Sequence, residues 1–221
     1  MSNSQEKKII GILGYPLGHS ISPIFQQAAF DSAGIDASYE RWSVPPENMQ
    51  GFLDDIRRNN FIGANVTIPY KEVVIGYLDE LDAKAEKIGS VNTIVNCDGR
   101  LVGYNTDSYG FLRSIEKFCP RLDFPKQSAL LIGAGGASRA VMYSLIDKGI
   151  GSMIVANRTI SRAKALTEQF GKEIDVGIIG ISNTELRSAA VNSSIIVNCS
   201  SVGMKNGDSE SLLLLDCSAI R

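Results

Sequence analysis

The sequence predicts an α/β fold with mainly parallel sheets, divided into two domains. Segments typical of strands and of helices alternate along the whole chain, which is the pattern of domains built from βαβ units. One unit, at 129–159, shows the full order of strand, glycine-rich loop, helix and strand. The length of 221 residues exceeds an average domain of ~150 residues, which favours two domains over one.

The first half begins with an apolar run at 8–14 that ends in glycine, which predicts a buried strand. Ser22 and Pro23 are typical of an N-cap followed by proline, and predict a helix that ends near Gly34. Three further elements follow: a helix with an apolar face of Met49, Phe52, Leu53 and Ile56, a strand in which Ile62, Ala64, Val66 and Ile68 alternate with small or polar residues, and a strand at 91–96.

The pattern changes after Asp107, where we expect the domain boundary, with domains at 1–106 and 107–221. Apolar residues at helical spacing in 111–118 predict a helix, and 120–125 then breaks the chain with two prolines. The second half is predicted to contain strands at 129–132, 152–156 and 194–197 and helices at 137–148 and about 161–170.

Composition and charge exclude several classes of protein. The net charge is −2, and the longest basic runs are the pairs Lys7-Lys8 and Arg57-Arg58, which we interpret as solvated surface rather than a nucleic-acid face. No apolar stretch approaches the ~18 residues of a membrane span. The polar start at 1–8 does not resemble a signal peptide.

The cysteine and histidine content argues against a metal or redox centre. Cys97, Cys119, Cys199 and Cys217 are far apart in the sequence, so we expect free buried thiols in a reducing cytoplasm. A single histidine, His19, excludes any site that needs several imidazoles. It is predicted to shape its loop through a hydrogen bond rather than to act as a general base.

The glycine-rich loop has the spacing Gly133-x-Gly135-x-x-Ser138. Gly133 permits a tight turn out of the strand, Gly135 lets a pyrophosphate approach bare backbone, and the following helix N-terminus offers free N–H groups. A glycine-rich turn without a ligand is the competing interpretation. Because the loop follows a strand and opens a helix, the sequence favours a Rossmann-type dinucleotide-binding domain.

The residues after the second strand of this unit indicate which dinucleotide is bound. An NAD-specific site normally has an Asp or Glu about twenty residues past the loop, to bind the ribose 2′-hydroxyl. This chain has Asn157 and Arg158 there, with Arg162 one helical turn onward. A guanidinium can bind a 2′-phosphate, so we expect NADP. The alternative is that Arg158 is only a surface residue at a helix start.

Three polar clusters in the first half are predicted to follow strand ends, where open α/β sheets bind their ligands. They lie at 18–23, at 65–71, and in a split pair at 90–93 and 103–107. Together they offer hydroxyls, amides, one lysine and one aspartate. That set suits a small polyhydroxylated carboxylate, although each cluster alone has a structural explanation, such as a helix cap or a turn.

The ordered motifs GYPLGHSISP, NVTIPYK, GSVNT, GYNTD, GAGGASRA and NRT resemble those of the shikimate dehydrogenase family, from about Ile9 to Met204. The resemblance implies reversible reduction of 3-dehydroshikimate to shikimate with NADPH, on the chorismate route to the aromatic amino acids. It also implies a substrate-binding domain at 1–106, an NADP-binding domain at 107–221, and a monomer or homodimer without nucleic-acid or membrane partners.

The same resemblance implies roles for individual residues. Lys71 and Asp107 would form the catalytic pair. The substrate would be bound by Ser20, Ser22, Asn65, Thr67, Lys71, Asn92 and Asp107. The cofactor would be bound by Gly133, Ala134, Gly135, Gly136, Ala137, Asn157, Arg158, Thr159, Arg162 and Met204. An ammonium within ~3 Å of a ketone oxygen can supply the proton that reduction requires, and a partly desolvated lysine can act as the base in the reverse direction.

The last residues, 205–221, match none of the family's C-terminal segment, so the chain is expected to lack that part. The apolar run at 212–215 is interpreted either as a strand or as a segment without its partner. Full family chemistry is then expected if the natural protein is longer or if dimerisation covers the gap. Two alternatives remain open: a quinate/shikimate paralogue, and a truncated NADP-binding protein without catalysis.

Overall fold

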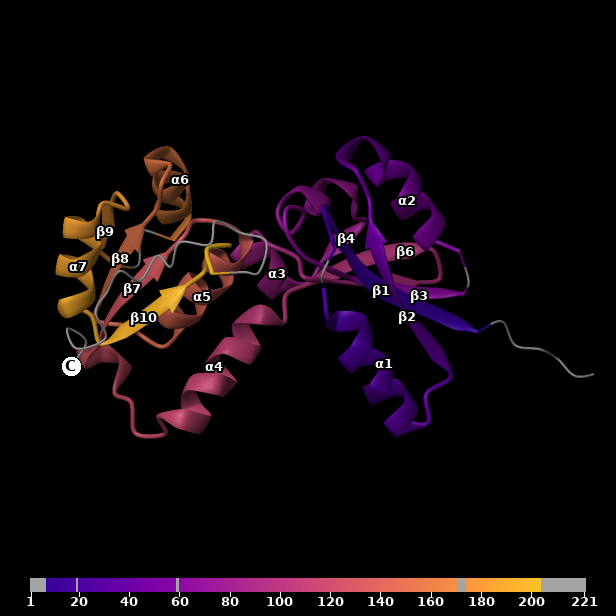
Figure 1. Cartoon of the computed structure of the whole chain (residues 1–221), viewed down its shortest axis with the longest axis horizontal. Coiled ribbons are helices and arrows are strands. Elements are labelled where there is room, and N and C mark those ends of the chain that lie inside the picture. Colours follow the sequence, from indigo (N-terminus) through magenta and orange to yellow (C-terminus); the bar gives the residue numbers. More distant parts are fainter. Residues whose placement is uncertain (1–6, 19, 59, 171–173, 204–221) are drawn as a thin grey trace, which may run out of the picture. The chain divides into compact units, whose positions relative to one another are not determined.

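The computed structural model describes residues 7–18, 20–58, 60–170 and 174–203, and it divides into two compact units at 1–106 and 107–221. Each unit has its own sheet (Figure 1). Both sheets combine with helices, and parallel pairings predominate, so the predicted α/β class is confirmed.

The first unit contains a six-stranded sheet in the order β2-β1-β3-β5-β6-β4. Only the pairings of β5 with β3 and with β6 are antiparallel. Asp98 and Gly99, both at positive φ, join β5 to β6 in a tight hairpin, as an Asp-Gly turn favours. The strands are β1 Lys8–Gly14, β2 Ala37–Ser43, β3 Phe61–Val66, β4 Glu80–Leu81, β5 Thr93–Cys97 and β6 Arg100–Tyr104.

The helices of the first unit are α1 Ser22–Ala33, α2 Met49–Ile56 and α3 Ala83–Ile88, with 3₁₀ turns η1 Pro46–Asn48 and η2 Val73–Tyr77. Helix α2 buries Met49, Leu53 and Ile56, the face that the sequence predicts. These side chains join a core that includes Leu13, Ile94 and residues of the central strands. Full burial of each large apolar side chain contributes ~1.5–3 kcal/mol relative to exposure.

The second unit is a four-stranded parallel sheet in the order β10-β7-β8-β9. Successive residues of β7 face opposite sides, and Leu131 and Leu130 belong to two different core clusters. Helices therefore cover both faces, as in doubly wound folds. The elements are α4 Asp107–Phe118, η3 Phe124–Lys126, β7 Ser128–Ile132, α5 Gly136–Asp147, β8 Ser152–Ala156, α6 Ile160–Phe170, β9 Val176–Ile179, α7 Asn183–Val191 and β10 Ile195–Asn198.

The edge strand β2 is partly covered by a side chain of α1. The Gln27 side chain accepts a hydrogen bond from the Tyr39 backbone N–H at 2.8 Å and donates to the Ala37 carbonyl at 3.1 Å. A side-chain amide has the same donor and acceptor as a peptide group, so Gln27 pairs with β2 as a short piece of neighbouring strand would.

Two local expectations about element ends are wrong. Ser22 does not cap α1, because it lies inside the helix; the N-cap is Ile21, which makes no side-chain capping bond. Strand β3 ends at Val66, so Ile68 lies in the following loop and is 54% exposed. The alternating pattern continues past the strand, because the last bond to β1, from the Thr67 N–H to the Leu13 carbonyl, is followed by a turn closed by the Tyr70 N–H on the Thr67 carbonyl.

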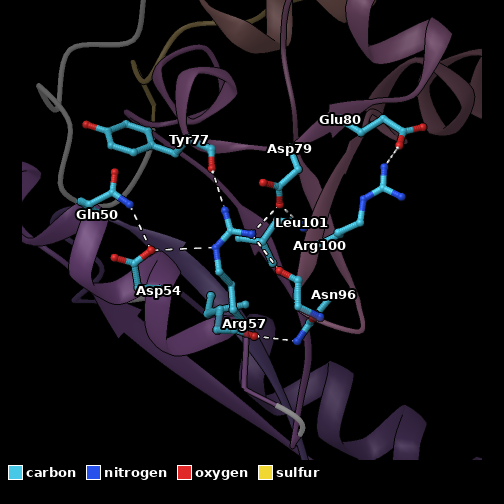
Figure 2. Close-up of polar contacts among 11 residues, drawn as sticks. Gln50, Asp54, Arg57, Tyr77, Asp79, Glu80, Asn96, Arg100 and Leu101 are labelled. Atoms are coloured by element: carbon cyan, nitrogen blue, oxygen red, sulfur yellow. Dashed lines mark hydrogen bonds and ion pairs between the residues drawn. The ribbon is translucent and has the colours of Figure 1, made fainter.

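The expectation of a solvated Arg57 is also wrong (Figure 2). Its guanidinium forms an ion pair with Asp79 and donates to the carbonyl oxygens of Gly99 and Tyr77, at 2.8 and 3.4 Å. These partners lie 20 to 42 residues away in sequence, which is why a local pattern did not reveal them. The pair Lys7-Lys8 is exposed, as expected.

The thiols differ from expectation as well. Cys97 and Cys119 are exposed and Cys199 is half-buried, so the predicted burial of these side chains is wrong; all three are free thiols. The exposed pair lies at element ends, where the short strand β5 and helix α4 leave the core. Cys217 lies outside the described residues.

Candidate active site

Three strands end and one strand begins at the same border of the first sheet. This edge is formed by strand ends and differs from the outer strand β2. Strands β1, β3 and β6 finish there, and the antiparallel β5 begins there, since Thr93 pairs with both Asn65 and Tyr104. The loop after β1 contacts the loop after β3 through a hydrogen bond from the Tyr15 N–H to the Ile68 carbonyl, at 3.1 Å. The three polar clusters that the sequence predicts are thus brought to this edge.

The first cluster carries Ser20 and Ser22, both half-buried. The Ser20 hydroxyl lies 3.2 Å from that of Ser22 and accepts from the Ser22 backbone N–H at 3.3 Å. Arg41 of β2 donates to the carbonyl oxygens of Ser20 and Gly18, at 2.5 and 3.3 Å. The two hydroxyls therefore sit side by side on a backbone that a guanidinium holds, which suits two oxygens of a carboxylate.

The second cluster is a compact turn after β3 that carries Thr67 and Lys71. The Thr67 N–H donates to the Leu13 carbonyl at 2.9 Å, and the Tyr70 N–H donates to the Thr67 carbonyl at 2.9 Å. The Lys71 carbonyl accepts from Val91 at 2.7 Å. Because both ends of the turn are bonded to neighbouring segments, the half-buried Lys71 side chain starts from a fixed backbone.

Tyr70 anchors this turn from inside. Its hydroxyl donates to the Val44 carbonyl at 2.6 Å, and the residue is 2% exposed. Burial raises the pKa of the Tyr70 hydroxyl, and the charge of Glu47 and the proximity of Tyr15 raise it further. The phenol therefore stays a neutral donor over the whole physiological range.

The third cluster is joined to Asn65 of the second cluster and to Tyr39 of β2 by a continuous chain of hydrogen bonds. The Tyr39 hydroxyl donates to Asn65 Oδ1 at 2.7 Å, and Asn65 Nδ2 lies 3.4 Å from Thr93 Oγ1. Thr93 Oγ1 lies 3.0 Å from Asn92 Oδ1, which also accepts from the Thr106 N–H at 2.9 Å. Asn65 and Asn92, 27 positions apart in sequence, thus belong to one network.

Asp107, the last of the expected substrate contacts, is the first residue of α4 and is half-buried. It is the first residue of the second unit, since the first unit ends at Thr106. Its pairing with Lys71 therefore stays a prediction.

The glycine loop of the second unit connects β7 to α5. Gly133 has φ +112°, and a Cβ there would lie 3.0 Å from the Cys199 carbonyl carbon, so only glycine fits against the segment after β10. A Cβ at Gly135 would meet no described atom within 4 Å. The loop is therefore packed tightly at its first glycine and open at its second, as close approach of a pyrophosphate requires.

The remaining residues of the loop form the start of helix α5. Ser138, fully buried, accepts from the Gly135 N–H at 3.3 Å. Gly136 opens α5 and Ala137 follows it, both half-buried, while Ala134 is buried at 8% exposure. The first turn therefore carries small side chains only, and its backbone N–H groups and partial positive charge can face an anion.

The end of β8 carries the residues expected near the 2′-position of the ribose. Asn157 donates through Nδ2 to the Thr159 carbonyl at 2.8 Å, which shapes the turn into α6. Arg158, Thr159 and Arg162 are exposed. Among the residues that the structure describes, the Arg158 guanidinium makes no hydrogen bond or ion pair. A cation without a counter-ion at a helix start is the arrangement that an anionic ligand would complete.

Two expected residues, His19 and Met204, lie outside the described residues. Two residues beside the clusters, Tyr39 and Arg41, were not expected as part of the site, and Thr93, inside the predicted cluster 90–93, had no role of its own assigned. Tyr39 and Arg41 lie on β2, and their spacing of two along Ala37–Ser43 is the one signal that placed both side chains on one face. Within the described ranges, no group of three or more potential ligands could hold a metal ion, and no helix is long and apolar enough to cross a membrane.

Comparison with known proteins identifies both halves of the chain. Residues 12–94 match the family model described as the shikimate dehydrogenase substrate binding domain, and residues 116–216 match the model described as shikimate / quinate 5-dehydrogenase. A shikimate dehydrogenase (NADP(+)) of Symbiobacterium thermophilum is 40% identical over 212 residues, which are 95% of this chain and 71% of that protein.

Solved structures give the same relationship. Shikimate dehydrogenase from Aquifex aeolicus has a TM-score of 0.84 at 34% identity, and the match covers 100% of this chain and 77% of that one. The shikimate 5-dehydrogenase of Thermus thermophilus, in complex with NADP(H) and shikimate, has a TM-score of 0.75 at 38% identity. That match covers 89% of this chain and 69% of the other.

Proposed function

The chain belongs to the shikimate dehydrogenase family, and we propose that it reduces 3-dehydroshikimate to shikimate with NADPH, using the edge of the first sheet and the glycine loop of the second. The observation that carries this is the 40% identity over 212 residues to a shikimate dehydrogenase (NADP(+)). The enzyme is an NADP-dependent oxidoreductase, and we assign it to the cytoplasm, where it would act on a small-molecule substrate as a monomer or homodimer.

The residues present fit NADP better than NAD. The open space at Gly135 admits a pyrophosphate against the backbone of the loop 133–137, with the α5 N-terminus behind it. Arg158, without a partner in the described chain, would bind the 2′-phosphate together with Asn157, Thr159 and Arg162. No carboxylate in 157–162 opposes that phosphate. When bound, NADPH supplies the hydride that reduces the carbonyl carbon.

The chain's own residues bind and orient the substrate. Ser20 and Ser22 would hold its carboxylate through their adjacent hydroxyls. Asn65, Thr67 and Asn92 would bind its ring hydroxyls from the turns and strands at the sheet edge. Because these groups are joined to each other or to backbone, little conformational entropy is lost when the substrate binds.

Lys71 would deliver the proton. As the carbonyl carbon is reduced, negative charge develops on the carbonyl oxygen, and an ammonium within hydrogen-bond reach can neutralise it by proton transfer. Asp107 would orient Lys71, balance its charge and contact a substrate hydroxyl. In the oxidation direction, the neutral amine would take the hydroxyl proton, so one side chain serves both directions.

We expect Lys71→Met to lower kcat for shikimate oxidation by ~10²–10⁴, with a much smaller change in KM, since the ammonium acts mainly in the transition state. Initial rates of NADP⁺ reduction with varied shikimate would measure both constants. Lys84→Ala, an exposed lysine of α3, serves as the control and should leave both constants unchanged. A Lys71→Met variant with wild-type kcat would contradict the assigned role.

The same assay separates the alternatives. A quinate/shikimate paralogue is suggested by the second family description, and it would oxidise quinate, or use NAD⁺, with kcat/KM equal to or above that for shikimate and NADP⁺. A non-catalytic NADP-binding protein would bind NADPH in a titration and show no shikimate-dependent reduction of NADP⁺. Either result would overturn the proposed activity.

A further inference from the structure

Tyr39 is a buried side chain at the proposed substrate edge that the reaction itself does not use. It lies in β2, is 7% exposed, and donates from its hydroxyl to Asn65 Oδ1 at 2.7 Å. Its backbone N–H is held at 2.8 Å by Gln27, so both ends of the residue are fixed. Burial raises the pKa of Tyr39 to about 12, which keeps the phenol protonated and able to donate.

The direction of the whole hydrogen-bond chain follows from one backbone group. The Thr106 N–H can only donate, so the Asn92 atom that it bonds at 2.9 Å must be the oxygen. That oxygen lies 3.0 Å from Thr93 Oγ1, and the proton between two oxygens must come from the threonine hydroxyl. Thr93 Oγ1 has then no proton left, and it can only accept from Asn65.

Asn65 is therefore oriented by both neighbours. Its Nδ2 group must face Thr93, so its oxygen must face Tyr39, whose phenol donates to it. Turning the amide over would place Oδ1 against a threonine oxygen without a proton, and the phenol oxygen, although able to accept from Nδ2, would lose the acceptor of its own O–H. The oxygen of Asn65 is thus directed to the buried Tyr39, and the second hydrogen of Nδ2, which bonds neither neighbour, is left for a ligand at this half-buried residue.

We propose that Tyr39 is a positioning residue, which locks the Asn65 amide with N–H outward so that the site selects a ligand oxygen able to accept a hydrogen bond. The inference rests on the proposed function, because it assigns Asn65 to the substrate. Hydroxyl and carbonyl oxygens satisfy the donor. An ammonium group at the same ring position has no lone pair to accept the hydrogen bond from this N–H. A ligand that carries one there would be rejected.

The test compares Tyr39→Phe with wild type in shikimate titrations and in NADP⁺ reduction assays. The substitution keeps the ring and removes the donor, leaving Oδ1 without its buried partner and the Asn65 amide held by Thr93 alone. We expect Kd and KM for shikimate to rise about tenfold, kcat to change less than about threefold, and the Kd for NADP⁺ to stay the same. Tyr77→Phe, a phenol of η2 outside this chain of bonds, should leave shikimate binding unchanged.

A double-mutant cycle separates positioning from general damage. Asn65→Ala should weaken shikimate binding, and adding Tyr39→Phe to it should weaken binding by less than about twofold more, because Tyr39 then has nothing to orient. A further tenfold loss in the Asn65→Ala background, or a Tyr39→Phe variant with wild-type Kd, would overturn the inference alone. Wild-type protein that binds no shikimate would overturn the proposed function, and the inference with it.

Discussion

At the scale of single residues, the chain separates two kinds of polar group by whether they already have partners. Asn65, Thr93 and Asn92 are bonded to one another, and their directions are fixed before a ligand arrives. Arg158 is exposed and makes no such bond in the described part of the chain. The first kind discriminates between ligands by geometry, and the second attracts one by charge.

Replacing Arg158 tests the second kind. Arg158→Ala should raise the Kd for NADP⁺ about 10- to 100-fold, since a charge-assisted hydrogen bond is worth ~1.5–3 kcal/mol. The Kd for NAD⁺, which has no 2′-phosphate, should change little. Titration of both dinucleotides measures this selectivity, and Arg187→Ala in α7 is a control from the same unit. Equal losses for the two dinucleotides would mean that Arg158 does not contact the phosphate.

At the scale of elements, Arg57 and Asn96 join the C-terminal end of α2 to the β5–β6 hairpin (Figure 2). Asn96 Nδ2 donates to the Ile56 and Phe61 carbonyls at 2.8 and 2.9 Å, and its Oδ1 accepts from Gly99 at 2.7 Å. Asp79 accepts from both Arg57 and the Leu101 N–H. These side-chain hydrogen bonds hold together the turns at the end of the first sheet opposite the proposed active site.

The Asp79 carboxylate makes this connection dependent on pH. The hydrogen bond from Arg57, then that from Leu101, lower the pKa of Asp79 below its usual 3.8. A lowered pKa in the folded state means that the stabilisation is complete above the unfolded-state pKa and disappears as pH falls through the folded-state value. Asp79→Asn should therefore be less stable than wild type at neutral pH.

The stability difference should shrink once the pH falls below about 4. Urea unfolding of both proteins between neutral and acidic pH would show it. A difference that stays constant across this range would mean that the charge of Asp79 contributes nothing. Asp98→Asn, in the adjacent hairpin turn, provides the control, since Asp98 is not among the carboxylates that pair with Arg57 in the described chain.

Much of the element pattern was predictable, because it depends on local signals. The strands at 8–14 and 152–156 and the apolar face of α2 follow from apolar runs and helical spacing. The two-residue strand β4 lacks such a signal and forms because it pairs with β6. Two elements that were not predicted do have local signals: the Asp98-Gly99 turn precedes β6, and Ser182 caps α7, which buries Leu186, Ala189 and Ala190 on one face.

The residues of the candidate site can also be divided into those that local sequence signals predict and those that they do not. Glycine spacing and Arg158 are local features, and their chemistry can be inferred from residue types alone. Tyr39 could not be identified from sequence, because its role depends on contact with Asn65, 26 positions away. The register of β2 against β1 and of β1 against β3 brings them together, and that register is a property of the folded sheet.

At the scale of the whole molecule, the two sheets have separate cores, and we expect the two units to respond to different ligands. Trp42, the only tryptophan in the sequence, lies in β2 of the first unit. Its ring packs edge-on against Phe52, with centroids 5.2 Å apart, and tilted against Phe61, with centroids 6.0 Å apart. Tryptophan fluorescence should therefore report unfolding of the first unit alone.

We expect saturating shikimate to raise the midpoint of the Trp42 transition, and NADP⁺ to act mainly on unfolding followed in the second unit. A ligand at 100 times its Kd stabilises the state that binds it by ~2.7 kcal/mol. Fluorescence, together with hydrogen exchange of peptides from β7 and α5, would resolve the two effects. An NADP⁺-induced shift of the Trp42 transition equal to that of the second unit would show that the units unfold as one.

The Gln27 contact with β2 has a consequence beyond a single molecule. Strand β2 lies at the edge of its sheet, and an open edge is a template on which a strand of another copy can add. By bonding the Tyr39 N–H and the Ala37 carbonyl, Gln27 occupies the backbone groups that such an intruding strand would need. Gln27 therefore has two effects: it holds Tyr39 in place for substrate selection, and it disfavours edge-to-edge association of two copies of the protein.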